Sequence, residues 1–203
     1  LRDYGNPVGI ITKNHLVTRD VDILSDMASR SAAMVSVSIT SLRRDIQRVM
    51  EPRASTPERR LKAVEVLTKA GVPVNVMVAP VVPGLTDEEI PSIVQAAADA
   101  GARTAGYIVL RLPHAVKDLF GNWLAEHFPE RAGKVTNRIK DLRDGQMYYS
   151  AWGTRMSGSG VYAAYYDKIF ESACARAGLN QGAKCLSVHG FRRPEDGNQL
   201  RLL

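Results

Sequence analysis

A chain of 203 residues is long enough for one sizeable domain, and its 45% hydrophobic and 24% charged residues are ordinary for a globular protein. Lys and Arg number 27 against 21 Asp and Glu, and this charge of +6 suits an anionic ligand or nucleic acid without requiring either. The sequence has no stretch with the apolar length of a membrane span, and its start lacks a signal-peptide pattern. We therefore expect a cytoplasmic protein with no membrane partner.

Hydrophobic periodicity predicts that strands and helices alternate along the first part of the chain. The predicted order is strand 8–13, helix 19–31, strand 34–40, helical turn 45–50, helix 57–70, strand 72–81, helix 88–100 and strand 104–112. This alternation implies a parallel sheet, either doubly wound or curled into a barrel. The strand over 34–40 places the hydroxyl residues Ser36, Ser38 and Thr40 on one face, which favours the barrel.

The stretch 72–89, VPVNVMVAPVVPGLTDEE, has the pattern of a buried strand that leads into a loop and a helix. Pro80 and Pro83 are expected to stop the strand, and Thr86 is expected to cap the acidic start of the helix. Ligands gather at the carboxyl ends of parallel strands, so we expect chemistry near 79–85. A plain strand-to-helix connection is the simpler alternative.

Beyond residue 113 the pattern changes to helices without intervening strands, over 114–128, 129–143 and 159–177. We therefore divide the chain into a sheet-forming part, 1–113, and a helical C-terminal region, 114–203. The tail beyond Gly190 is expected to be mobile.

The two cysteines, Cys174 and Cys185, do not form a C-x-x-C pair. The sequence therefore offers neither a disulfide framework nor a recognisable metal site. The chain begins with Leu1 rather than Met, and we expect that upstream sequence has been removed.

Candidate binding residues follow from the predicted strand ends. Lys13, Ser38, Thr40 and Arg111 are expected at one edge of the sheet, where they could hold a carboxylate, a ribose or a phosphate. A solvated charge is the alternative for Lys13, and backbone-bonded hydroxyls for the other two strand-end residues. Arg111 lies in an apolar stretch and needs a partner, which a structural carboxylate would supply as well as a ligand.

The loop that contains Arg53 places cations on the same rim, close to a predicted helix start. Helix N-termini favour anions, so this loop could contribute to a site. A solvated loop with local charge pairs is the alternative.

Six segments together resemble a known family: ITK, SVSIT, EPRASTPERRL, VMVAPVVPGLTDEE, GYIVLRLPHAVKDLF and GTRMSGSG. They resemble the radical SAM superfamily, and specifically the bacterial group similar to spore photoproduct lyase, from residue 7 to about residue 178. The resemblance implies an α/β fold, a partial (β/α)6-type parallel barrel that lacks its first strands here and carries a helical C-terminal region.

The resemblance also implies cofactors and partners. A [4Fe-4S] cluster is held by a C-x-x-x-C-x-x-C loop, and S-adenosylmethionine chelates its open iron. Reductive cleavage then yields a 5′-deoxyadenosyl radical that takes a hydrogen atom from the substrate. An electron donor such as flavodoxin or ferredoxin is implied, and the likeness to a lyase makes nucleic acid a candidate substrate.

The resemblance assigns residues to parts of S-adenosylmethionine. The methionine carboxylate is expected near Lys13 and Ser38, the ribose near Ser36 and Thr40, and the adenine near the loop with Val81 and Val82. Arg53 and Arg111 are the further candidates for the anion.

The sequence departs from the family pattern at the cluster. No C-x-x-x-C-x-x-C occurs, and two distant cysteines cannot replace three thiolates. We expect the cluster ligands upstream of Leu1 and an inactive chain in their absence. Two alternatives stay open: a basic nucleic-acid-binding barrel without redox chemistry, and a phosphate-handling α/β barrel enzyme that uses Lys13 and Arg111.

Overall fold

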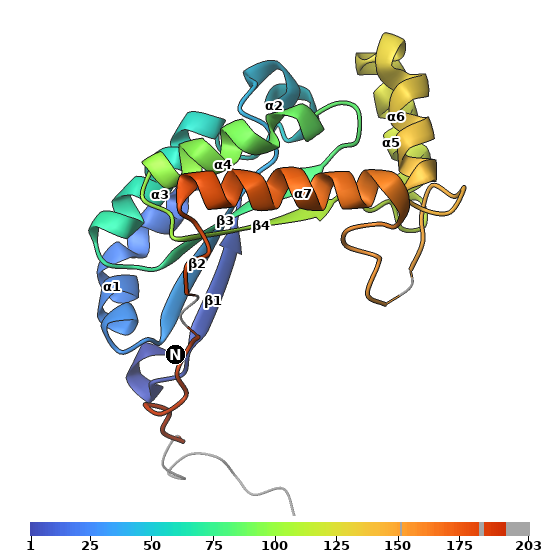
Figure 1. Cartoon of the computed structure of the whole chain (residues 1–203). Coiled ribbons are helices and arrows are strands. Elements are labelled where there is room, and N and C mark those ends of the chain that lie inside the picture. Colours follow the sequence, from blue (N-terminus) through green and yellow to red (C-terminus); the bar gives the residue numbers. More distant parts are fainter. Residues whose placement is uncertain (151, 183–184, 194–203) are drawn as a thin grey trace, which may run out of the picture.

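The computed structural model describes residues 1–150, 152–182 and 185–193, and it shows a four-stranded sheet flanked by helices (Figure 1). The strands are β1 (Val8–Thr12), β2 (Ala33–Ile39), β3 (Val74–Val81) and β4 (Thr104–Val109). They run parallel, and their order in the sheet is their order in the sequence. The predicted α/β fold with a parallel sheet is therefore confirmed, and the open sheet corresponds to part of a barrel.

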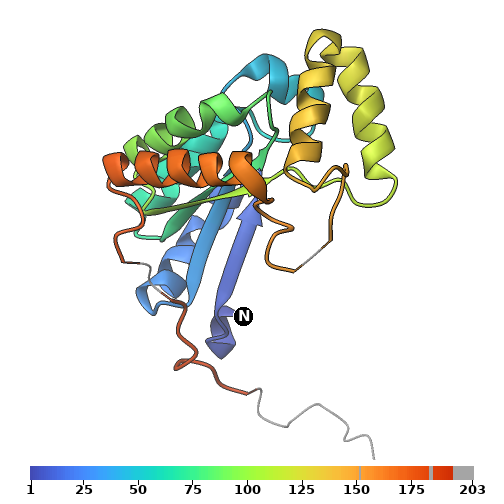
Figure 2. The ribbon, with the colours of Figure 1, turned by 45° about the vertical axis from the view of Figure 1, so that its right-hand side comes forward.

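Helices connect the strands and then follow the last strand. The α-helices are α1 (Val21–Ser29), α2 (Arg44–Met50), α3 (Pro57–Lys69), α4 (Ile90–Asp99), α5 (Val116–His127), α6 (Pro129–Asp141) and α7 (Gly160–Ala177). The short 3-10 helices are η1 (Arg2–Tyr4), η2 (His15–Asp20) and η3 (Asp87–Glu89). Helices α1, α3, α4 and α7 cover one face of the sheet, and α7 lies beside α4 (Figures 1 and 2).

The two faces of the sheet differ in the way the period-2 pattern predicts. The valines and isoleucine of β2 and the three alternating valines of β3 are almost fully buried against the helices. The opposite face carries half-buried Ser36 and Asn75, whose amide nitrogen Nδ2 donates to Ser36 Oγ at 3.3 Å. Polar side chains therefore line the face that the four covering helices leave open.

A second, smaller core joins the α5–α6 pair to the carboxyl ends of the strands. Its buried residues are Ile46, Val82, Leu85, Leu110, Leu112, Phe120, Leu124, Val135 and Ile139. Helix α7 instead packs on the main core, where the ring of Phe170 lies 5.0 Å from that of Tyr107 on β4. The division of the chain at 113/114 stays a prediction.

Several predicted boundaries are wrong, for identifiable reasons. Strand β3 continues through Pro80 and ends at Val81, β4 ends at Val109, and the pairing of the two strands shifts register between Val78 and Val81. The hydroxyl of Thr86 does not cap a helix, since it accepts a hydrogen bond from Val82 N at 2.9 Å and closes the loop.

Two further helices correct the predicted pattern. The helix predicted over 19–31 is divided into η2 and α1, and the helix predicted from residue 88 begins at Ile90 after η3. The tail predicted to be mobile lies largely outside the described residues. Within the described part of the chain, no helix combines the length and the apolar character needed to cross a membrane.

Strand β1 lies at one edge of the sheet, and we expect this edge to promote self-association. Ile11 on this strand is 75% exposed, whereas Ile10 packs against the main core. We expect Ile11→Lys to reduce self-association, because an exposed apolar edge is a template for intermolecular pairing. The free energy of unfolding should change by less than about 0.5 kcal/mol, as at other surface sites.

The matched control is Ile10→Lys. It should lower the free energy of unfolding by roughly 2 kcal/mol or more, because it removes apolar burial and places a charge against the core. Light scattering after size exclusion and thermal unfolding measure the two effects. Self-association that persists undiminished in Ile11→Lys would show that this edge is not its source.

Candidate functional site

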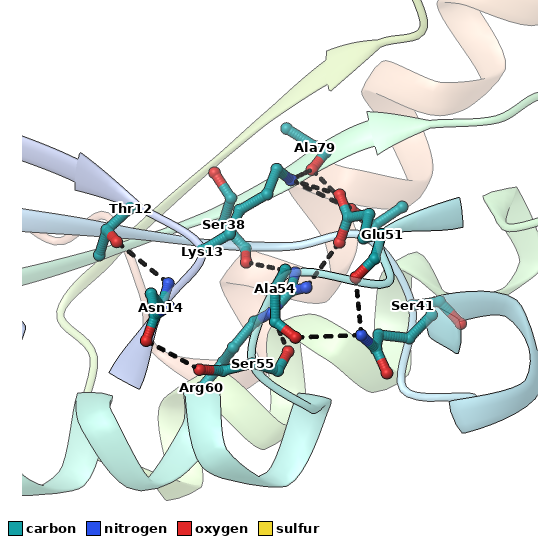
Figure 3. Close-up of polar contacts among 12 residues, drawn as sticks. Thr12, Lys13, Asn14, Ser38, Ser41, Glu51, Ala54, Ser55, Arg60 and Ala79 are labelled. Atoms are coloured by element: carbon teal, nitrogen blue, oxygen red, sulfur yellow. Dashed lines mark hydrogen bonds and ion pairs between the residues drawn. The ribbon is translucent and has the colours of Figure 1, made fainter. Parts of the chain in front are cut away.

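The candidate site lies where the carboxyl ends of three parallel strands meet. Lys13 follows β1, and its ammonium Nζ donates to Ala79 O of β3 at 2.8 Å. The same nitrogen lies 3.2 Å from the hydroxyl of Thr40, which follows β2, and 2.8 Å from Glu51 Oε1 (Figure 3). One ammonium group therefore links the ends of β1, β2 and β3.

Glu51 also pairs with a buried arginine. The guanidinium of Arg60, in the first turn of α3, donates to Glu51 Oε2 at 2.6 Å and is 1% exposed (Figure 3). Its other nitrogens donate to Ser38 O at 3.0 Å and Ser55 O at 2.7 Å. Arg60 thus ties α3 to β2 and to the loop after α2, with all of its nitrogens bonded.

Helix α3 holds Arg60 in place for reasons that are local. Thr56 Oγ1 accepts from Arg59 N, and Pro57 occupies the first helical position. Arg60 then falls on the same face as buried Ala63, Val64 and Leu67, at the i+3, i+4 and i+7 spacing. A cation on the apolar stripe of a helix is costly to bury, and a buried carboxylate offsets this cost.

The charges in this cluster sum to +1, since Lys13 and Arg60 share Glu51. Burial raises the pKa of Glu51, but the hydrogen bonds and charges of Lys13 and Arg60 outweigh burial and hold that pKa below its ordinary value. Burial lowers the pKa of Lys13, although Glu51 opposes this effect. The Lys13 side chain is 36% exposed and that of Glu51 only 11%, so the excess positive charge faces solvent at Lys13.

The predicted site residues are only partly brought together. Thr40 joins Lys13 in the cluster, Ser38 is buried beside it, and Ser36 lies farther back on the open face. Val81 and Val82 are buried at the end of β3. Arg53 is exposed on its loop, and Arg111 lies after β4, beside Tyr148 and Met156.

Sequence reasoning missed Glu51 and Arg60 as partners. The segment was predicted as a cationic loop, and its one acid was not assigned to the cations around it. The signal that could have found the pair is the position of Arg60 on the apolar face of α3.

The site has the chemistry to hold the methionine end of S-adenosylmethionine. A Lys13 side chain that is 36% exposed, in a cluster of charge +1, suits a carboxylate, and the hydroxyl and amide groups of the open face suit a diol. The [4Fe-4S] cluster does not fit the described residues. They contain no group of three residues able to hold a metal, and Cys174 is buried in α7 while Cys185 lies beyond it.

A cavity of about 690 Å³ lies at the opposite edge of the sheet. Gly71, Val72, Ala102 and Gly178 line it near the amino ends of β3 and β4. Since the polar cluster lies at the carboxyl ends, this cavity is distinct from the candidate site.

Comparison with known proteins shows which families and relatives this chain resembles. Residues 1–97 match the model of the radical SAM superfamily. Sequence relatives include the uncharacterized protein Rv2578c of Mycobacterium tuberculosis, 34% identical over 140 residues, or 68% of this chain and 40% of that protein. Another is the uncharacterized protein MJ0683 of Methanocaldococcus jannaschii, 28% identical over 82 residues, or 40% of this chain and 30% of that protein.

Solved structures agree with the family match. Spore photoproduct lyase complexed with dinucleoside spore photoproduct superposes with a TM-score of 0.55 at 18% identity, over 85% of this chain and 49% of that one. A mutant of spore photoproduct lyase gives a TM-score of 0.54 with the same coverage. The segment 1–97 is therefore similar to the radical SAM superfamily. Its fold is similar to that of spore photoproduct lyase, and it spans about 40% of the length of its mycobacterial relatives.

The Glu51 carboxylate generates a test of stability. Glu51→Gln keeps the shape but leaves buried Arg60 without a counter-ion, and we expect a loss of roughly 3–5 kcal/mol in the free energy of unfolding at pH 7. Chemical unfolding measures this loss. Glu58→Gln is the matched control, because Glu58 pairs with exposed Arg44 and should cost less than about 1 kcal/mol.

Wild type and Glu51→Gln together also test the lowered pKa of Glu51. A carboxyl with a lowered pKa in the folded state contributes stability above its unfolded pKa, near 4.3, and loses it as the pH falls through the folded pKa. The difference between wild type and Glu51→Gln should therefore be constant from pH 7 to about pH 5 and shrink below that range. A difference that does not change down to the acid transition would contradict the assignment.

Proposed function

We propose that this chain forms the S-adenosylmethionine-binding part of a radical SAM enzyme. The observation that carries the proposal is the positively charged Lys13 cluster at the joined ends of β1, β2 and β3, in a chain that matches the superfamily. The chemistry that S-adenosylmethionine supplies in this superfamily is a radical that removes a hydrogen atom from the substrate. The residues of this chain bind and orient the cofactor.

The proposed roles are those that the resemblance to the family implies. Lys13 binds the methionine carboxylate, with Ser38 beside it, and Thr40 and Ser36 face the ribose. The contacts of Lys13 with Ala79 O and Glu51 fix its ammonium, so that binding costs little further side-chain entropy. The loop with Val81 and Val82 packs against the adenine. Arg53, exposed on the loop after α2, remains a further candidate for the anion.

The cluster ligands are proposed to come from outside this sequence. Three thiolates hold such a cluster, and the two cysteines here lie in α7 and beyond it. We therefore propose that the chain is a portion of a longer enzyme and is inactive alone. Such an enzyme needs an electron donor such as flavodoxin or ferredoxin.

The substrate class is proposed from the relatives and the charge. Spore photoproduct lyase is solved with dinucleoside spore photoproduct, and this chain carries a formal charge of +6. The dinucleoside complex supports a nucleic-acid-derived substrate, and the positive charge suits the phosphate groups that such a substrate can carry.

The experiment is a calorimetric titration of S-adenosylmethionine into the full-length gene product, reconstituted anaerobically. Lys13→Ala should weaken affinity roughly tenfold to more than a hundredfold, because a hydrogen bond to a charged group contributes about 1.5–3 kcal/mol. The absorbance of the iron–sulfur cluster should not change, since Lys13 does not ligate it.

The control for this titration is Lys117→Ala, which removes an exposed cation on α5. It should bind S-adenosylmethionine as wild type does. Thermal unfolding of each variant separates lost binding from lost folding. Equal affinity in Lys13→Ala and wild type would remove Lys13 from the site.

A further inference from the structure

A second cationic cluster lies past the carboxyl end of β4, whereas the Lys13 cluster lies at the carboxyl ends of β1, β2 and β3. Arg143 follows α6 and is 2% exposed, and its nitrogens donate to Thr154 O at 3.1 Å and to Leu110 O at 3.2 Å. Both acceptors are neutral carbonyls. Arg143 is therefore a buried positive charge held in place by groups that do not neutralise it.

Arg111 lies next to Leu110 and adds a second charge. Its Nη2 is 3.4 Å from the hydroxyl of Tyr148 and its Nη1 is 3.9 Å from Met156 Sδ, both long contacts. Its Nε is buried and has no hydrogen-bond partner among the described residues, and the same holds for Thr154 Oγ1. Two buried polar atoms of this region are thus left without a partner among the described residues.

Two other arginines that are at least three-quarters buried have carboxylate partners. Arg60 pairs with Glu51 and Arg138 with Asp87, at 2.6 and 2.7 Å. Within residues 1–150, 152–182 and 185–193, no ion pair involves Arg111 or Arg143. Burial lowers the pKa of Arg143, and the charge of Arg111 lowers it further. The partner that the sequence required for Arg111 is therefore not a carboxylate of the described chain.

We propose that Arg111 and Arg143, with the hydroxyls of Tyr148 and Thr154, form a binding site for a phosphate group. The Arg111 guanidinium and two hydroxyls can donate to several oxygens, and two adjacent positive charges suit the charge of a phosphate better than that of a carboxylate. Arg111 contacts the anion, and Arg143 supplies positive potential from behind it.

The position of this site suits a substrate rather than the cofactor. Lys13 and Arg111 follow the two outer strands of the sheet, and three strand spacings separate these by roughly 14 Å. A phosphate at Arg111 would hold a substrate across the open edge from the methionine end of the cofactor. That role as a substrate site rests on the proposed function, whereas the anion site itself does not.

The loop beside the site offers surfaces for a base. Tyr149 and Trp152 are exposed, Trp152 by 85%, and the guanidinium of Arg155 lies 4.3 Å from the Trp152 ring centroid. Exposed aromatic rings next to cations are the elements that bind single-stranded nucleic acid. A phosphodiester is therefore one source of the phosphate, and a small phosphate ester is the other.

The test is calorimetric titration of inorganic phosphate into the full-length gene product and Arg111→Gln. We expect at least a tenfold loss of affinity in the variant. Arg103→Gln is the matched control, because Arg103 is exposed at the opposite end of β4. Equal binding by Arg111→Gln and wild type, or an equal loss in Arg103→Gln, would overturn the proposal. Arg111→Lys, which keeps the charge but not the planar fork, should show an intermediate loss and serves if Arg111→Gln does not fold.

Two further ligands distinguish the sources of the phosphate. A fluorescein-labelled decathymidylate is followed by anisotropy, and ribose 5-phosphate by calorimetry. For a phosphodiester, Arg111→Gln should weaken decathymidylate binding and reduce its salt slope by about one, and Trp152→Ala should weaken it without affecting inorganic phosphate. For a small ester, ribose 5-phosphate should bind in an Arg111-dependent way while decathymidylate does not. Binding of none of the three ligands would overturn the site.

Titration of S-adenosylmethionine keeps this proposal separate from the cofactor site. Arg111→Gln should bind S-adenosylmethionine as wild type does, and Lys13→Ala should retain phosphate binding. If Lys13→Ala did not change the affinity for S-adenosylmethionine, this result would count against the proposed function and not against the phosphate site. If Arg111→Gln instead lost S-adenosylmethionine and kept phosphate, Arg111 would belong to the cofactor and the phosphate site would be wrong.

Discussion

The carboxylate of Glu51 is the group on which the carboxyl edge of the sheet depends. It neutralises Arg60, which cannot be buried alone, and it holds Lys13 against the β3 carbonyl of Ala79. Parallel strands are joined only through long crossovers, and here the Lys13 and Glu51 side chains add a link between the ends of three strands beyond the backbone ladder. Because one carboxylate serves two cations, the group that stabilises the edge also leaves it positive. Stability and anion affinity at this edge therefore have a common origin.

The C-terminal helices depend on a second carboxylate. Asp87 accepts from Arg138 of α6 at 2.7 Å and from the hydroxyl of Tyr166 of α7 at 2.9 Å, and burial together with the Asp87 charge raises the pKa of Tyr166. This network is complete, with one acid for one arginine. Among the described residues, Arg111 and Arg143 have no carboxylate partner although they adjoin the same helices, so their uncompensated charge is a local feature and not a general lack of acids around the C-terminal helices.

Much of the fold could be predicted from the sequence because strands and helices have short-range sequence patterns. The valines of β3 and the Thr56–Pro57 start of α3 needed only short-range patterns. The pairing of Glu51 with Arg60, and the loop closure by Thr86, depend on which segments meet in space, and periodicity carries no such information. Lys13 and Thr40 were both expected from their places at strand ends, but the contacts of Lys13 with Glu51 and Ala79 O were not, since these partners lie far from it in the sequence.

The two edges of the sheet are not equivalent, and this limits how the sheet can be extended. On β4, the amide of Asn180 exchanges hydrogen bonds with Ala105 N and O, at 2.9 and 3.2 Å, and Met156 O accepts from Val109 N at 2.8 Å. These contacts occupy the groups that a further strand would need. Among the described residues, no backbone group pairs with the outer edge of β1 between Gly9 and Thr12. Any additional strand of a barrel must therefore join at β1, next to Lys13, and the Arg111 end of the edge stays on the opposite side of the opening.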